Sequence, residues 1–426
     1  MVEFLSLEST EALFAHIDPS LRLAGGLSID NGRSEADVLA LMTQRAEANR
    51  PVGSGLLCFA GGGAYDHDIP SVVAALAMRS EFVTAYTPYQ AEVSQGVLQA
   101  LFEYQTLVCR LTGMDVANAS LYDGASACVE AVNLAVAATG RRRVLASQGL
   151  APHVRQVLAT FAVGTGHEIV DVALSDGTTT WPAVPAAALV VAYPNYLGCI
   201  EDLESAAATA RASGALLIVM ADPVALGLLA SPGEYGADVV VGEGQPFGRP
   251  LSLGGPYLGF FACRQEHLRR LPGRLVGETV DADGRRAYVT TLRTREQDIR
   301  REKASSNVCT NQTLMAVAFL VHLAWLGTAG LAELALRCAR ATRYTRDQLL
   351  AIDGIGPLVS APVLREFALR LPRSPAEVVV AMAEEGFLAG VVLDTAYGDG
   401  LLVAVTEKRT RAEIDAYVAA MRRVVA

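Results

Sequence analysis

The sequence has 426 residues, a formal net charge of −10 and a pI of about 5.2, an acidic balance that argues against the phosphate backbone of nucleic acids as a partner. Its length favours two hydrophobic cores over one. Apolar residues make up 51% and charged residues 19%, with a mean hydropathy of +0.30, so we expect part of the apolar surface to be buried against another chain.

The first part of the chain, residues 1–83, is expected to form a segment of helices and loops. Ser34 and Asp37 favour a short helix from Glu35 onward, and the glycine run 61–63 marks a loop. The first six residues lack the basic stretch that opens a signal peptide. The seven cysteines are scattered singly, without the pairing of a zinc site or the density of a disulfide scaffold, which fits a reducing cytoplasm and predicts no metal site.

The middle part, residues 84–315, is expected to form a large α/β domain. From about Asp115 onward, short apolar runs alternate with amphipathic stretches. Runs that are apolar on both faces suit the strands of a parallel sheet covered by helices on each side, the doubly wound class. The expected strands are residues 144–147, 168–172, 188–193, 215–222 and 239–242, and the expected helices are 125–138, 152–161 and 203–213.

The last part, residues 316–426, is expected to hold a connecting helix and a small α+β domain. Residues 314–332 contain no Asp, Glu, Lys or Arg and nearly reach the length that spans a bilayer. His322 lies near the middle and charged helices flank the stretch, so we expect a core helix and no membrane partner. Further on, the pattern predicts helices at 331–353, 375–385 and 410–425 and strands at 366–371 and 401–405.

One candidate site residue, Asp222, ends the apolar run 215–221. Open parallel sheets bind their ligands beyond the carboxyl ends of the strands. A pyridoxal-phosphate enzyme of the large α/β kind keeps an aspartate at such a place, where it pairs with the pyridinium nitrogen of the cofactor. The alternative is a helix-capping aspartate before Pro223.

A second candidate is the turn Tyr122-Asp-Gly-Ala-Ser126, which lies between a strand-like stretch and a helix. The free N–H groups and the positive dipole end of a helix can hold a phosphate there. Asp123 would satisfy those donors itself and repel a phosphate, so a structural cap is an equal alternative.

Lysine is nearly absent from this sequence. A pyridoxal-phosphate enzyme binds its cofactor as a Schiff base on a lysine that follows a strand past the aspartate, but residues 241–250 contain none. The whole chain has only Lys303 and Lys408. We expect each to be a solvated surface charge, although the segment around Lys303 could also bind an anion. A self-sufficient pyridoxal enzyme is therefore not expected.

Long motifs run through the chain. They begin with Arg79-Ser-Glu-Phe-Val-Thr-Ala-Tyr-Thr-Pro-Tyr-Gln-Ala-Glu-Val-Ser-Gln-Gly96, continue with Thr112-Gly-Met-Asp-Val-Ala-Asn-Ala-Ser120 and Gly236-Ala-Asp-Val-Val-Val-Gly-Glu-Gly-Gln245, and end with Arg300-Arg-Glu-Lys-Ala-Ser-Ser-Asn-Val-Cys-Thr-Asn-Gln312. Together they resemble subunit 1, the α or N-terminal half, of decarboxylating glycine dehydrogenase, the P protein of the glycine cleavage system. The resemblance covers nearly the whole chain, and its motifs are long enough to be specific.

The resemblance implies the type I pyridoxal-phosphate-dependent transferase fold, which is aspartate aminotransferase-like, with a doubly wound, mostly parallel sheet and a smaller α+β C-terminal domain. It also implies an α2β2 assembly in which only subunit 2 carries pyridoxal phosphate. In that partner the lysine follows a histidine and precedes Thr-Phe-x-x-Pro, which places Gln245 at the lysine position of this chain. An amide cannot form a Schiff base, so Asp123, Ser126, Asp222 and Gln245 would form a vestigial site.

The implied reaction releases carbon dioxide from glycine and passes the aminomethyl group to the lipoyl arm of a small H protein. This chain would be an oxidoreductase subunit that is inactive alone. In the family, segment 84–95 lies near the active site that the two halves share, so Tyr86, Tyr89, Gln90 and Glu92 are expected to reach the partner's cofactor or glycine. The alternative from residue type alone is a turn around Pro88 with core tyrosines.

Two stretches depart from the family pattern. Leu150-Ala-Pro152 stands where Val-His-Pro is usual, and Ala192-Tyr-Pro-Asn195 stands where Gln-x-Pro-Asn is usual. Such losses would be neutral around an empty site. They would equally suit a paralogue whose complex acts on another amine or a glycine-like substrate, and a non-catalytic scaffold is a third hypothesis.

Overall fold

The computed structural model describes residues 1–23, 25–84 and 88–426, and the chain divides into two units, Met1–Pro51 and Val52–Ala426. The first unit contains short 3-10 helices at Thr10–Phe14 and Pro19–Leu21 and the helix α1 (Glu35–Glu47). The hydroxyl of Ser34 accepts a hydrogen bond from the N–H of Asp37 at 3.2 Å, which confirms the predicted start of α1. None of the described residues of this unit is buried.

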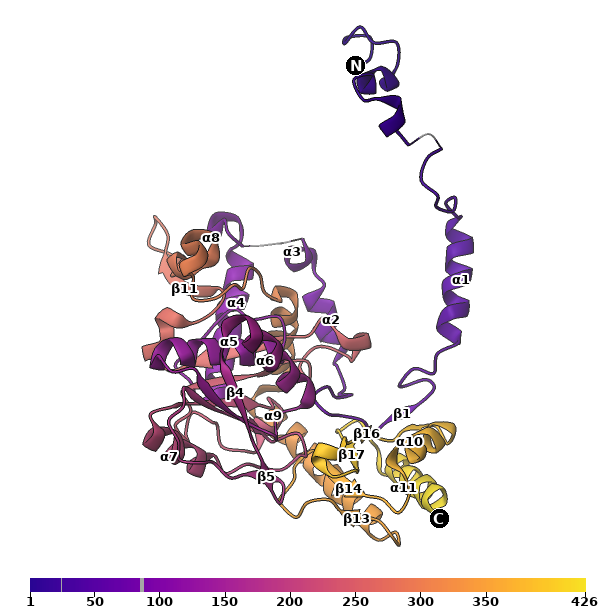
Figure 1. The fold of residues 1–426 in the computed structure, drawn as a ribbon, viewed down its shortest axis with the longest axis vertical. Helices are drawn as coiled ribbons and strands as arrows, with labels where there is room; N and C mark the ends of the chain where they lie inside the picture. The colour runs from indigo at the N-terminus through magenta and orange to yellow at the C-terminus, as the bar shows by residue number, and fades with distance from the viewer. Residues whose placement is uncertain (24, 85–87) are drawn as a thin grey trace. The chain divides into compact units, whose positions relative to one another are not determined.

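A seven-stranded sheet forms the centre of the second unit, in the order β2-β10-β9-β8-β7-β3-β4. Figure 1 labels β4, the strand at one edge of this sheet. The strands from β9 to β4 pair in parallel, while β10 is antiparallel to both of its neighbours. The five predicted strands of the large domain are confirmed, but the antiparallel edge was not predicted. The bounds are β2 (Val116–Ala117), β3 (Arg143–Ser147), β4 (Glu168–Val172), β7 (Ala188–Tyr193), β8 (Leu216–Ala221), β9 (Val239–Glu243) and β10 (Gly259–Cys263).

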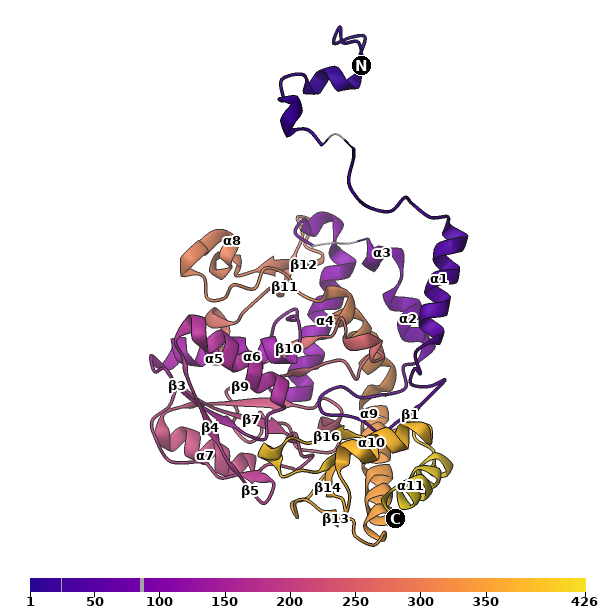
Figure 2. The ribbon, with the colours of Figure 1, turned by 45° about the vertical axis from the view of Figure 1, so that its right-hand side comes forward.

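Helices cover both faces of this sheet because its central strands are apolar on both faces. In β7, Leu189 and Val191 face one core, whereas Ala188 and Val190 face the other. The first core includes residues of α4 (Gln95–Thr112) and α7 (Leu203–Ser213), and the second includes residues of α5 (Gly124–Thr139) and α6 (Pro152–Thr165). Figure 2 labels these four helices. These layers are the doubly wound α/β arrangement that the sequence predicts.

The long helix α9 (Thr313–Leu350) connects the sheet to the C-terminal layer and contains a non-helical residue, Gly327, with φ 60°. Length and composition alone would allow it to cross a membrane, as they would for core helices of many globular proteins. Its apolar half packs in the core, where the ring of Phe319 meets that of Phe247 at a centroid distance of 5.3 Å. The core-helix prediction therefore holds for residues 316–323, most of which are buried, whereas Trp325 further along the run is 60% exposed.

The C-terminal layer is a four-stranded antiparallel sheet in the order β13-β14-β17-β16 with α10 (Pro375–Glu384) and α11 (Arg411–Val425). Residues just after the first unit join it, since β1 (Leu57–Cys58) pairs with β15 (Phe387–Leu388). The loop after β1 then runs toward the large sheet. The strand bounds are β13 (Gly356–Pro357), β14 (Glu366–Arg370), β16 (Val391–Val392) and β17 (Leu401–Ala404).

Shorter elements complete the second unit. A hairpin of β11 (Leu275–Val280) and β12 (Arg286–Thr291) leads into the short helix α8 (Gln297–Arg300). Among the described residues, the remaining short α-helices and strands are α2 (Ser71–Ala77), α3 (Ser80–Val83), β5 (Leu174–Ser175) and β6 (Thr178–Thr179).

Candidate active site

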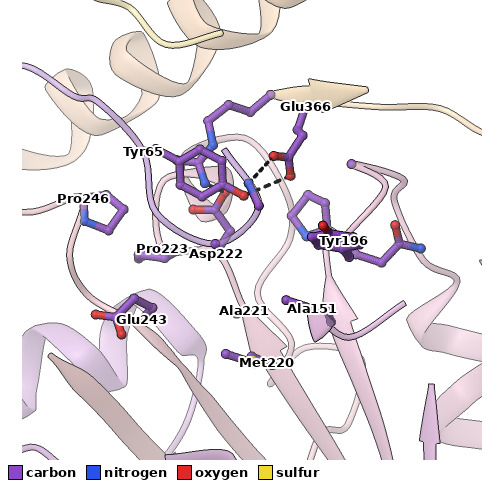
Figure 3. Close-up of a pocket in the computed structure, with 17 residues that line it drawn as sticks. Tyr65, Ala151, Tyr196, Met220, Ala221, Asp222, Pro223, Glu243, Pro246 and Glu366 are labelled. Atoms are coloured by element: carbon purple, nitrogen blue, oxygen red, sulfur yellow. Dashed lines mark hydrogen bonds and ion pairs between the residues drawn. The ribbon is translucent and has the colours of Figure 1, made fainter. Parts of the chain in front are cut away.

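A cavity of about 90 Å³ lies where the carboxyl ends of β7, β8 and β9 meet the start of β14 (Figure 3). Doubly wound folds bind ligands at this end of their strands. Asp222 and Glu243 line the cavity from the strand ends, Tyr65 lines it from the loop after β1, and Arg365 and Glu366 line it from the C-terminal layer. Three segments that are far apart in the sequence therefore meet at one place.

Asp222 is engaged inside the protein on both of its oxygens. Its Oδ2 forms an ion pair with Arg365, and its Oδ1 accepts a hydrogen bond from the N–H of Val224 at 3.0 Å. The side chain of Arg365 is only 4% exposed, and its guanidinium lies 3.5 Å from the ring centroid of Tyr65. Burial opposes the charge of Arg365, but the Asp222 carboxylate raises the pKa of this guanidinium above its usual value.

A hydrogen-bonded chain continues from Arg365 away from the cavity. Its Nη1 lies 2.8 Å from Nε2 of His67, and Nδ1 of the same ring lies 2.6 Å from Oε2 of Glu407. Because a guanidinium can only donate, Nε2 is the acceptor and Nδ1–H donates to Glu407. The N–H of Asp68 and the thiol of Cys338 also donate to this carboxylate. These contacts hold Arg365 from both sides.

Gln245 is fully buried, and three hydrogen bonds occupy its amide. Its Oε1 accepts from the N–H of Tyr65 at 3.0 Å, and its Nε2 donates to the carbonyl oxygens of Tyr65 at 3.0 Å and of Arg249 at 2.8 Å. The side chain thus ties the loop after β1 to the segment after β9. It has no basic nitrogen that could react with an aldehyde.

Carboxylates occupy the first N–H groups of α5. Asp123 accepts a hydrogen bond from the N–H of Ser126 at 2.7 Å, and Glu243 accepts one from the N–H of Gly124 at 3.0 Å. The capping interpretation of Asp123 is therefore confirmed. Burial raises the pKa of Glu243 to about 7, despite the backbone hydrogen bonds that favour its ionised form.

Glu366 was missed by the sequence reasoning, as was its neighbour Arg365. The Glu366 carboxylate accepts hydrogen bonds from the N–H of Gly62 at 2.6 Å and from the hydroxyl of Tyr65 at 3.0 Å (Figure 3). Burial raises the pKa of Glu366 to about 7. The only sequence signal was a pair of charged residues at the start of an apolar strand.

The residues around this cavity do not fit pyridoxal phosphate. An amide stands at the lysine position, Arg365 covers the aspartate, and two carboxylates occupy the helix donors that would bind a phosphate. The cavity is also smaller than the ~300–1,000 Å³ typical of pockets that enclose an organic ligand. The structure brings Asp123, Asp222 and Gln245 to one region, and each is held by other groups of the chain.

Tyr89 lies on a different surface and does not line this cavity. Its side chain is 47% exposed, so it is not a core tyrosine. Its hydroxyl accepts a hydrogen bond from Nη2 of Arg274 at 3.0 Å, and the guanidinium carbons of Arg274 and Arg293 lie 5.1 and 4.7 Å from its ring centroid. Tyr86, which was predicted to act with it, lies outside the described residues.

Gln90 and Glu92 are exposed beside Tyr89, whereas Pro88 is buried. Behind Tyr89, Arg274 is 5% exposed and is held by Asn311 Oδ1 at 3.0 Å and by the carbonyl oxygen of Cys309 at 3.1 Å. The phenol is therefore oriented by a buried, hydrogen-bonded arginine. No sequence pattern connected these segments.

The two lysines differ from each other. Lys303 is exposed, as predicted. Lys408 is not a free surface charge, because its Nζ pairs with Asp66 at 2.8 Å and its side chain is 32% exposed. Asp66 lies in the loop that passes the cavity. The prediction for Lys408 was therefore wrong, because the ion pair joins two residues that are distant in the sequence and meet only in the folded chain.

Comparisons with known proteins point to one family. A sequence model described as "Glycine cleavage system P-protein" matches residues 1–421. A probable glycine dehydrogenase (decarboxylating) subunit 1 from Moorella thermoacetica is 49% identical over 98% of this chain and 95% of the relative. The inhibitor-bound crystal structure of glycine decarboxylase (P-protein) of the glycine cleavage system superposes with a TM-score of 0.94 and 44% identity, covering 100% of this chain and 97% of the other. A sphingosine-1-phosphate lyase from Burkholderia pseudomallei shares the fold alone, with a TM-score of 0.67 and 15% identity over 95% and 93% of the two chains.

Proposed function

The chain belongs to the glycine cleavage system P-protein family, and we propose that it acts as subunit 1 of a two-subunit decarboxylating glycine dehydrogenase. The observation that carries the proposal is the similarity over nearly the full length to relatives named as this subunit. Subunit 2 completes the enzyme. The substrate is glycine, which loses carbon dioxide, and the aminomethyl group passes to the lipoyl arm of H protein.

Pyridoxal phosphate belongs to the partner subunit in this proposal. Gln245 offers an amide in place of an amine, and Arg365 has neutralised the aspartate that would face the pyridine nitrogen. The cofactor in the partner supplies the electron sink for decarboxylation. This chain supplies surface groups and no covalent attachment.

Tyr89 is the group of this chain that we expect to reach the partner's active site. Because its oxygen already accepts a hydrogen bond from Arg274, its own O–H is left to donate. Two guanidinium groups beside the ring make this position favourable for an anion such as the glycine carboxylate. Gln90 and Glu92, exposed beside Tyr89, would act in the same contact by orienting the substrate and excluding water, and the family resemblance assigns the same role to Tyr86.

The assembly that follows is an α2β2 enzyme of the cytoplasm, with H protein as a transient partner. An acidic chain with many apolar residues suits a protein that buries surface against another subunit. The described residues of the first unit are all at least partly exposed, and its large apolar side chains include Phe4, Leu21 and Ile29. Contact with the partner would remove such side chains from water.

The test is glycine-dependent exchange of labelled bicarbonate by the reconstituted pair with H protein. Tyr89→Phe removes one hydroxyl and is expected to lower the exchange rate about 10- to 100-fold, the range for a lost hydrogen bond to a charged group. Tyr344→Phe is the matched control, because the Tyr344 hydroxyl also makes one side-chain hydrogen bond, to Asp415 at 2.6 Å, but lies near the end of α9, where that helix meets α11.

The outcomes separate the hypotheses. An intact complex without exchange would remove glycine decarboxylation as the function and favour another amine substrate. Exchange that is unchanged by Tyr89→Phe would leave the reaction in place but give this chain only a scaffold role.

A further inference from the structure

A second hollow, of about 200 Å³, is lined mainly by the segment that follows the β11–β12 hairpin. Figure 2 shows the course of this segment, which includes α8. Four cationic side chains line the hollow, together with two hydroxyl groups and Leu292. No acidic side chain is among its lining residues in the described part of the chain. The lining cations are Arg269, Arg295, Arg300 and Lys303, and the hydroxyls belong to Thr294 and Ser305.

Three of these cations have no anionic partner. Within residues 1–23, 25–84 and 88–426, the side chains of Arg269, Arg300 and Lys303 make neither an ion pair nor a hydrogen bond. The neighbouring Arg293 differs, because its Nη2 binds Asp298 at 2.9 Å. The charges of these three cations are thus not paired with any acidic side chain in the described part of the chain.

Arg295 is the most buried of the four cations. Its Nη1 donates to the carbonyl oxygen of Leu271, whereas its Nε and Nη2 are buried without a hydrogen-bond partner. Burial lowers the pKa of this guanidinium, against the attraction of Glu296, whose Oε1 also lacks a partner. Buried donors without acceptors are costly, and an anion in the hollow could satisfy them.

The backbone on each side of this cluster is strained. Leu292 and Arg301 both have φ of 53°, a region that residues other than glycine rarely adopt. Strain of this kind persists only where the surroundings enforce it, and it is common at ligand sites. The two residues bracket the turn that carries Arg295 and Arg300.

We propose that this hollow is a binding site for a phosphate group. Four cations are matched better by a dianion than by a single carboxylate, and guanidinium groups bind phosphate oxygens through paired hydrogen bonds. The volume is below that of pockets that enclose a whole organic ligand, so the site takes inorganic phosphate or the phosphate end of a monoester.

The site adjoins the Tyr89 surface, because Arg293 contacts the Tyr89 ring and Arg295 lies two residues further on. A phosphate held here would lie near the surface that we expect to face the partner subunit. The inference nevertheless rests on the unpaired cations of this chain and is independent of the proposed function.

The experiment is a calorimetric titration of the full chain with inorganic phosphate at constant ionic strength in chloride. We expect saturable binding at one site, weakened about tenfold or more in Arg300→Met/Lys303→Met. The matched control, Arg110→Met/Arg370→Met, removes the same charge from two exposed positions on α4 and β14 and should bind as the unmodified chain does. Glycerol 3-phosphate in place of phosphate tests a monoester, and acetate tests a single carboxylate.

Tighter binding of the monoester than of phosphate would support the site and identify the end of a larger molecule as its ligand. Equal binding of both would support a site for the phosphate group alone. No saturable binding of either would overturn the proposal, and so would equal weakening in the control variant or acetate binding as tight as phosphate. Unfolding curves of both double variants verify that each protein is folded.

Discussion

Replacing Arg365 with methionine is expected to destabilise the second unit by about 3–5 kcal/mol, because the change leaves Asp222 buried without its ion-pair partner. The side chains of Arg365 and Asp222 are 4% and 15% exposed, so water can replace little of what is lost. Methionine keeps most of the volume and length, which limits the contribution of a cavity. The variant also loses the contact with the Tyr65 ring and the hydrogen bond to His67.

The expected loss can be measured as a shift of the unfolding temperature. An unfolding entropy of about 2.1 cal/mol/K per residue gives roughly 0.8 kcal/mol/K for this unit, so the midpoint should fall by about 4–6 °C. Differential scanning calorimetry of the isolated chain is the assay. Arg143→Met is the control, since Arg143 and Glu168 form an ion pair whose side chains are 47% and 54% exposed, and its removal should change stability by no more than about 0.5 kcal/mol.

A double variant tests the cause. Asp222→Asn should also be destabilising, because it leaves the Arg365 charge buried. Asp222→Asn/Arg365→Met should lose clearly less than the sum of the two single variants, since neither unpaired charge is then present. Strict additivity, or an Arg365→Met chain as stable as the unmodified one, would refute the view that Arg365 neutralises the vestigial aspartate.

Further outcomes concern the cofactor and pH. The isolated chain mixed with pyridoxal phosphate should show no Schiff-base absorbance, and a borohydride-reducible adduct on Lys303 would contradict the proposal that the partner alone binds the cofactor. Gln245→Lys by itself should not create such absorbance, because Asp123 and Glu243 still occupy the N–H donors at the start of α5 and the cavity stays small; a reducible adduct on the introduced lysine would contradict this account. Burial raises the pKa of Glu366 to about 7 from a usual value of 4.5, so its carboxyl binds protons more tightly in the folded chain than in the unfolded one. The contribution of Glu366 to stability should therefore be complete below pH 4.5 and should be lost as the pH rises to about 7. In unfolding curves recorded across this pH range, Glu366→Gln should lose less stability as the pH rises. An unaltered dependence of stability on pH would disprove the raised pKa of Glu366.

Much of the local structure was encoded over short distances in the sequence. The strand β7 and the helix α7 lie where the apolar pattern predicted them, because side-chain periodicity is a property of a few neighbouring residues. The cap of Asp123 on α5 also depends only on the next three residues. The family resemblance predicted that Gln245 stands at the lysine position. This single residue was sufficient to predict that the chain forms no Schiff base.

The contacts between distant segments were decided by the tertiary structure. Arg365 meets Asp222 only because β14 of the C-terminal layer begins against the carboxyl edge of the large sheet. Arg274 and Arg293 flank Tyr89 only because the hairpin segment folds against the residues before α4. Charged residues whose sequence pattern is typical of an exposed surface therefore form contacts inside the folded chain. Periodicity and capping cannot predict this, because they describe neighbours along the chain and not neighbours in space.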